Sequence, residues 1–212
     1  MGYKYDFSTR DGMLEKLRAY AANPDDDTIR IKAKIKDMFM HCPELLYALD
    51  AKEYEDQLFD KDGNLNIDEN GEPLGEWDSY FGENSYIRPY LYIPETQTKM
   101  NCYVCYQVSF SELQRYNEAV KYCIITFTVF VNGGHSIDEL TGIPRHDLIA
   151  GIIREKFAWT GLTIASAVPV KDEESITDTH YLVRTLQFQA ELPNNLVKTT
   201  NGKTSYNNKR SY

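Results

Sequence analysis

The stretch VKYCIITFTVFV, residues 120–131, decides the fold class. Apolar side chains occupy both alternating sets of positions along it, a pattern typical of a strand that is buried on both faces. Such a strand lies in the interior of a sheet and needs a neighbour on each side. The flanking sequence should therefore supply further strands, and helices that cover the sheet.

Four further segments have strand patterns. Upstream, residues 101–110 (NCYVCYQVSF) alternate regularly, and the prolines within residues 86–94 (YIRPYLYIP) favour an edge strand. Downstream, residues 162–170 (LTIASAVPV) follow a helical segment. Residues 181–192 (YLVRTLQFQAEL) predict an antiparallel strand with one apolar and one polar face.

The segment between these strand groups, GIPRHDLIAGIIREKF (142–157), predicts an amphipathic helix. Pro144 suits the first helical position, and Asp147 falls in the first turn, where the helix dipole favours negative charge. The apolar stripe that packs on the sheet consists of Leu148, Ile149, Ile152, Ile153 and Phe157.

The first fifty residues also predict helices, at 11–22, 28–42 and 43–50, the second of which Asp26 or Asp27 can cap. Because the strands come in runs, we predict an α+β fold. It consists of a mostly antiparallel sheet of about five strands, with the N-terminal helices and the helix at about 144–157 packed on one face.

Charge is unevenly distributed along the chain. The formal net charge of −9 argues against a general binder of nucleic acids or anionic membranes. Residues 50–83 contain twelve acids and two lysines, whereas residues 193–212 contain four basic residues and no acid. We therefore predict a single domain, 1–192, with an acidic hairpin or loop insertion at about 51–85, followed by a polar basic tail, 193–212. No internal repeat is evident.

Other classes of protein receive little support. No apolar run is long enough for a transmembrane helix, and the N-terminus has no secretory signal. The four cysteines, at 42, 102, 105 and 123, do not form a disulfide framework, which favours a reducing compartment. Cys102 and Cys105 have redox-motif spacing, but in a strand they point to opposite faces and are expected to be buried.

A weak calcium candidate lies in the insertion, with Asp60, Asp62, Asn64 and Asp68 as its oxygen ligands. Neither register of an EF-hand loop places a glutamate at position 12, so turn formation explains these residues better. We predict no metal and no cofactor.

The histidines do not form a recognisable catalytic motif. His41 and Cys42 are adjacent in a helix and diverge, and His135 and His180 lie in loops. Arg145 and His146 are predicted at the solvated start of the 144–157 helix, where they are available to another subunit.

The order of strand, loop, GIPRHDLIAGIIREKFAWTG and TDTHYLVRTLQFQ resembles neck and tail-completion proteins of tailed bacteriophages, over residues 86–192. That resemblance implies a tail-terminator or head–tail joining subunit without catalytic residues. It implies a ring, often a hexamer, in the virion neck, which contacts other neck and tail proteins and through which genomic DNA passes without sequence-specific binding. Such a protein is made in the host cytoplasm and needs no membrane.

The basic tail is then expected to contact neighbouring subunits through residues Lys198, Lys203, Lys209 and Arg210, together with Arg145 and His146. An acidic insertion on a neighbour would be complementary to it. Two alternatives stay open: a small cytosolic enzyme with a site at His135, His146 or His180, and an adaptor that binds a protein through its sheet edge.

Overall fold

The computed structural model describes residues 5–21, 27–49, 58–82, 85–91, 102–110, 120–139, 141–159, 167–177, 180–193, 196–199 and 202–205. Its helices are α1 (Arg10–Ala21), α2 (Asp27–Met40), α3 (Pro43–Ala48), α5 (Asp78–Phe81), α6 (Arg145–Phe157) and the short 3-10 helix η2 (Gly133–His135). Its strands are β1 (Ile87–Arg88), β2 (Cys102–Phe110), β3 (Val120–Asn132), β4 (Val168–Ile176), β5 (Tyr181–Pro193), β6 (Leu196–Thr199) and β7 (Gly202–Ser205).

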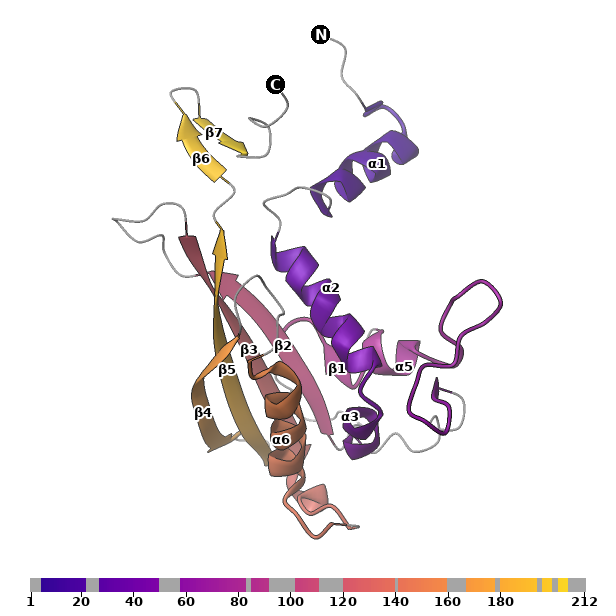
Figure 1. Cartoon of the computed structure of the whole chain (residues 1–212), viewed down its shortest axis with the longest axis vertical. Helices are drawn as coiled ribbons and strands as arrows, with labels where there is room; N and C mark the ends of the chain where they lie inside the picture. Colours follow the sequence, from indigo (N-terminus) through magenta and orange to yellow (C-terminus); the bar gives the residue numbers. More distant parts are fainter. Residues whose placement is uncertain are drawn as a thin grey trace.

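Five strands form one mixed sheet in the order β1-β2-β3-β5-β4. Each neighbouring pair among the last four strands is antiparallel, and the two-residue β1 is parallel to β2. The predicted α+β class and the central position of the 120–131 strand are confirmed, because β3 lies between β2 and β5 (Figure 1).

Two strand predictions are wrong in their bounds. In the segment predicted as a strand at 86–94, only Ile87 and Arg88 pair; residues 92–94 lie outside the described part of the chain. The strand predicted at 162–170 overlaps β4 at Val168–Val170, and β4 continues to Ile176; residues 162–166 of the predicted segment lie outside the described part of the chain. Every residue of β4 is exposed and its middle is charged, so this edge strand has no apolar alternation for the sequence to reveal.

Helices α2, α3 and α6 contribute to the main core on one face of the sheet, as predicted. The prediction that all the N-terminal helices pack there is wrong for α1, whose described residues contribute no side chain to this core. Phe127 of β3 is at the centre of this core. Its ring centroid lies 4.6 Å from that of Phe157 in α6, 5.7 Å from Phe39 in α2 and 5.8 Å from Phe188 in β5. These aromatic contacts join three elements that are distant in sequence to the central strand.

The opposite face of the sheet has a smaller core, formed by Tyr103, Cys105, Phe130, Tyr181 and Val183. The rings of Tyr103 and Phe130 stack with their centroids 4.8 Å apart. The buried guanidinium of Arg88 lies 4.8 Å from the Tyr103 ring centroid. This second core explains why β3 is apolar on both faces. It also means that the one-sided pattern predicted for 181–192 does not hold at Tyr181 and Val183.

Residues 58–74, here termed the turn ladder, contain a short structural repeat, although no internal repeat is evident in the sequence. The backbone N–H of Asn66 donates to the Leu58 carbonyl at 2.9 Å, and that of Leu74 donates to the Asn66 carbonyl at 2.7 Å. The repeat spacing is therefore eight residues. Each unit contains an aspartate that caps a turn and a glycine with positive φ, Gly63 (81°) and Gly71 (85°). The predicted bounds of the insertion, 51–85, stay a prediction because residues 50–57 and 83–84 lie outside the described part.

The two ends of the chain project from this body. In Figure 1, helix α1 and the hairpin of β6 paired with β7 lie beyond the upper end of the sheet. Apolar side chains around α1 are exposed, including Phe7 (46%), Met13 (43%) and Leu17 (54%). No helix in the described residues is long and apolar enough to cross a membrane.

We predict that Phe127→Ala lowers the free energy of unfolding by about 3–5 kcal/mol, because it removes the ring around which the other aromatic side chains pack. Urea titration followed by circular dichroism measures this change. Phe7→Ala, which truncates an exposed ring, serves as the control and should change stability by less than about 0.5 kcal/mol. Equal losses in the two variants would contradict the central role of Phe127.

Candidate functional site

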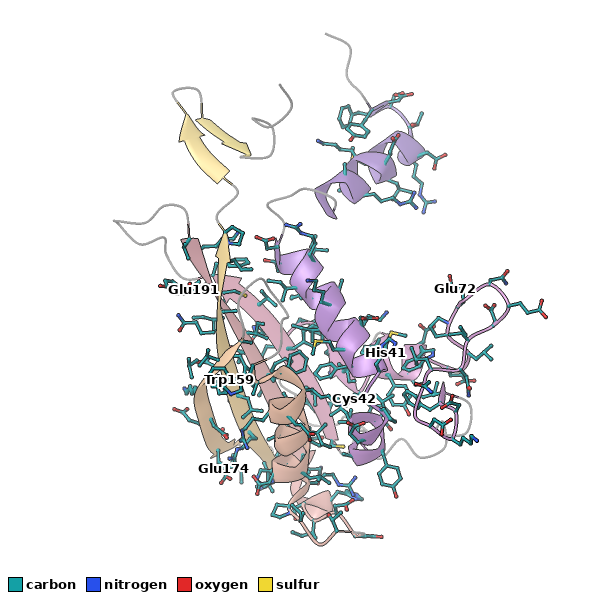
Figure 2. The ribbon with its side chains drawn as sticks, in the orientation of Figure 1. His41, Cys42, Glu72, Trp159, Glu174 and Glu191 are labelled. Carbon is teal, nitrogen blue, oxygen red and sulfur yellow. The ribbon has the colours of Figure 1, made fainter. Side chains whose placement is uncertain are left out.

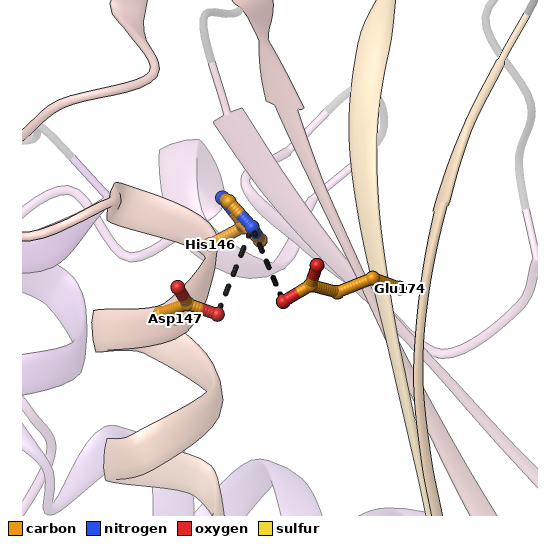
Figure 3. A group of neighbouring side chains, drawn as sticks. All are labelled: His146, Asp147 and Glu174. Atoms are coloured by element: carbon orange, nitrogen blue, oxygen red, sulfur yellow. Dashed lines mark ion pairs between the residues drawn. The ribbon is translucent and has the colours of Figure 1, made fainter.

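A cluster of charged side chains joins α6 to the β4 edge of the sheet. Figure 3 shows three of its members, His146, Asp147 and Glu174. Its centre is Arg184 of β5, whose Nε donates to the Asp172 carboxylate at 2.6 Å and whose Nη1 donates to the Asp147 carboxylate at 2.6 Å. The Nη1 group also contacts Glu174, and Arg154 of α6 contacts Asp172. We term this set, together with His146, the Arg184 cluster.

The local sequence explains how these groups meet. Arg184 has the same strand parity as the core residues Leu186 and Phe188, so it lies on the face that α6 covers. In the register of the sheet, Glu174 of β4 is directly opposite Arg184. Asp147 lies in the first turn of α6, which sets its carboxylate near the start of β5.

Electrostatics favour the ionised forms of Asp172 and Arg184. The hydrogen bond from Arg184 holds the pKa of the Asp172 carboxyl below its ordinary value of 3.8, and burial opposes this shift. The same hydrogen bond raises the pKa of Arg184. The arrangement thus fastens the helix to the sheet edge through charge-assisted hydrogen bonds.

Part of the cluster has the composition of a metal site. His146 Nε2 lies 3.6 Å from Asp147 Oδ1 and 4.0 Å from Glu174 Oε1. Arg184 already donates hydrogen bonds to both carboxylates, so a cation there would have to displace the guanidinium. The buried Nδ1 of His146 has no hydrogen-bond partner in the described part of the chain, whereas metal-ligating histidines usually donate from their second nitrogen. The residues therefore fit an ion-pair cluster better than a metal centre.

The predicted exposure of Arg145 is wrong. Its side chain is 8% exposed, and its Nη2 lies 3.7 Å from the equally buried carboxylate of Asp138. Its Nη1 donates to the Ala48 carbonyl at the end of α3. Helix α6 begins at Arg145 rather than at Pro144, which is the N-cap residue. Arg145 therefore points into the protein, where it contacts the preceding loop through Asp138. His146 is also mostly buried, with 13% of its side chain exposed.

Other sequence candidates are separated or inert. The Cys42 side chain is buried and burial raises its pKa to about 12, whereas His41 is exposed (Figure 2). The two therefore form no nucleophile–base pair. Cys102 lies in the main core and Cys105 in the smaller one, which confirms that the two thiols point to opposite faces of the sheet.

A polar pocket of about 490 Å³ beside η2 is lined by residues that include His135, Ser136, Asp138 and Arg145. A histidine, a serine and a carboxylate are the residue types of a hydrolytic site, but the carboxylate of Asp138 is bonded to other groups. Asp138 accepts hydrogen bonds from the backbone N–H and the hydroxyl of Thr141, and it pairs with Arg145. Among the described residues, His135 makes no hydrogen bond to Ser136 or Asp138, so the contact that would activate a nucleophile is missing. His180 lies in a turn with φ of 63°.

The calcium candidates build the turns of the ladder. The Asp60 carboxylate accepts from the backbone N–H groups of Asp62 and Asn64, and the Asp68 carboxylate accepts from those of Asn70 and Glu72. Backbone hydrogen bonds, from Asn64 and Glu72 respectively, are the main cause of the lowered pKa of Asp60 and Asp68. Within the described residues these four candidates do not gather into a metal-binding group.

The proposed assembly residues are described only in part. Lys198 lies in β6 and Lys203 in β7, while Lys209 and Arg210 lie outside the described residues. Sequence reasoning missed Arg184, Asp172 and Glu174. The sequence does contain a signal for Arg184. It occupies a strand position that faces the core, and a charged side chain there needs a partner. None was available for the β4 carboxylates, because β4 itself was misplaced.

The fold and these clusters define an α+β protein whose buried charges hold its elements together. Comparison with known families is more specific: the chain belongs to the YomW family, whose model matches residues 43–190. The family name is that of a phage-derived protein, so the chain is phage-associated. No curated protein matches the chain. The matched region begins at α3 and ends in β5, and it leaves out α1, α2 and the β6–β7 hairpin.

We predict that Arg184→Gln lowers the free energy of unfolding by about 1–2 kcal/mol at neutral pH. The folded-state pKa of Asp172 is depressed, so its stabilisation is present above the unfolded value and is lost as pH falls through the folded value. The difference between wild type and variant should therefore shrink in acid, as measured by denaturation at several pH values. Arg30→Gln, which removes a half-exposed arginine from its i,i+3 helix pair with Asp27 and leaves the Lys121–Asp27 pair in place, is the control and should cost less than about 0.5 kcal/mol. A pH-independent difference would argue against the ion-pair origin.

We predict that Zn²⁺ and Ca²⁺ leave the thermal midpoint of the wild-type protein unchanged, because Arg184 and the turn backbones already satisfy the candidate ligands. Arg184→Gln removes the competing cation and should gain a Zn²⁺-dependent rise in midpoint. Thermal denaturation with each metal and with chelator tests both statements. A metal-dependent rise in the wild type would restore the metal-site interpretation.

Proposed function

We propose that the chain is a non-enzymatic structural protein of a tailed-phage particle. In this role it is a ring-forming neck subunit, of the tail-terminator or head–tail joining type, that connects the portal side of the capsid to the tail. Membership of a phage-associated family supports the setting. The observation that carries the proposal is that both ends of the chain project from the sheet as elements that are marginal on their own.

These projecting elements need partner surfaces. Helix α1 has twelve residues, a length at which an isolated helix is only marginally stable in water. Its exposed Met13 and Leu17 are four residues apart and offer an apolar contact on one side of the helix. An isolated two-stranded hairpin such as β6–β7 is equally marginal. In an assembly, such projecting elements are stabilised by packing against a neighbouring subunit. If the subunits close into a ring, they enclose a channel.

The acidic charge fits the passage of DNA. A formal charge of −9 repels phosphates, so DNA would move through a channel of such subunits without adhering to the wall. In the same proposal the protein is made in the host cytoplasm, contacts other neck and tail proteins, and needs no cofactor.

The adaptor alternative is less well supported. Strand β4 forms one edge of the sheet, but it contains Pro169, a bulge between Pro169 and Lys171, and a run of charged residues. These features oppose the addition of a foreign strand. The enzyme alternative places a site at His135, His146 or His180. In the pocket at His135, the hydrogen bond between nucleophile and base is missing among the described residues.

We expect the purified protein, or the protein assembled with its neck partners, to form a closed ring, a hexamer in the form that the resemblance implies. Negative-stain electron microscopy and light scattering measure the symmetry and the mass. Antibody labelling of phage particles should mark the neck. A chain that stays a 24.5 kDa monomer with and without its neck partners, and is absent from particles, would refute the proposal.

A further inference from the structure

The hairpin of β6 and β7, here termed the terminal hairpin, has an unfavourable charge arrangement. Lys198 and Lys203 are direct partners in its register. Like charges placed opposite each other destabilise a pair of strands, which adds to the marginal stability of any two-stranded hairpin. An anionic surface against the hairpin would remove this repulsion.

The same chain offers such a surface on the turn ladder. Two of the ladder's acids, Asp60 and Asp68, are committed to capping turns. Asp62, Glu69 and Glu72 are different: they are exposed, and within the described residues their carboxylates pair with no cation. Figure 2 shows Glu72 on the loop that extends from the body. The ladder also exposes apolar side chains, Ile67 at 58% and Leu74 at 46%.

The two surfaces of one chain lie apart. The terminal hairpin follows the end of β5 and lies at the top of Figure 1, whereas the ladder extends sideways from the lower end of α2. A contact between them therefore joins two copies of the chain. Because the donor and acceptor surfaces differ, the contact is head-to-tail, the type that closes into a ring when its rotation permits.

We propose that the terminal hairpin of one copy docks on the turn ladder of the next copy. In this contact β6 and β7 supply two lysines, Lys198 and Lys203, as the cations that the free carboxylates of the ladder lack. The inference rests on the proposed function, for which it names the subunit contact. The ladder lies within the family match and the hairpin outside it, so the donor is a feature of this chain beyond the matched region.

Cysteine cross-linking tests the contact directly. A Lys203→Cys copy and a Glu72→Cys copy, mixed under mild oxidation, should form a disulfide-linked heterodimer as the main product. The native thiols, at Cys42, Cys102, Cys105 and Cys123, are all buried and leave the background low. Glu155→Cys, on the exposed side of α6, is the matched control and should not link to Lys203→Cys. Linkage of Lys203→Cys copies to each other instead would show that hairpins meet hairpins, and would overturn the proposal.

Charge reversal supplies a second test. Lys198→Glu combined with Lys203→Glu should weaken self-association about tenfold in sedimentation at low salt. Glu69→Lys combined with Glu72→Lys in the same chain should restore it. Unchanged association, accompanied by loss of binding to a short DNA duplex, would assign the hairpin to nucleic acid and overturn the inference.

The two proposals fail in different ways. A closed ring that persists in the charge-reversed protein and gives no cross-link refutes the hairpin contact and leaves the ring function standing. Cross-linked open chains that never close, in a protein absent from phage particles, refute the ring function and leave the contact standing.

Discussion

Burial of β3 on both faces is the constraint on which the rest of the structure depends. Phe127 fixes one face against α2 and α6, and Phe130 fixes the other against Tyr103. A strand covered on both faces can exchange neither its register nor its neighbours without exposing one of the two layers. The order of strands, the position of α6 and the location of both charged clusters follow from that arrangement.

The charged clusters act at the start of α6 and at the sheet edge, where the apolar layers end. Arg145 joins the start of α6 to the end of α3, and Arg184 joins its first turn to β4. Each guanidinium is mostly buried and has a carboxylate within reach, as a buried charge requires. The apolar core thus sets where the elements lie, and the arginines set how the helix is oriented on the sheet.

The sequence reveals those parts of the structure in which burial follows a simple period. β2, β3, β5 and the helices α1, α2 and α6 have such periods and were predicted to within a few residues. β4 was misplaced because an exposed edge strand has no apolar alternation. Arg145 was misjudged because its burial results from a loop closing back on α3, a contact that helix periodicity does not encode. The Arg184 cluster assembles residues from three separate elements. The only sign of it in the sequence is that Arg184 alternates in step with the apolar core residues of its strand.

The backbone spacing of the turn ladder has a consequence for how this chain can vary. Its hydrogen bonds recur every eight residues, and each unit supplies its own capping aspartate and glycine. Insertion or deletion of one whole unit would change how far the loop reaches while every remaining backbone bond stays intact. The sheet would not be disturbed, since only the first unit places a fully buried side chain, Leu58, in the core. The ladder is therefore a spacer whose length can change in discrete steps, independently of the domain that carries it.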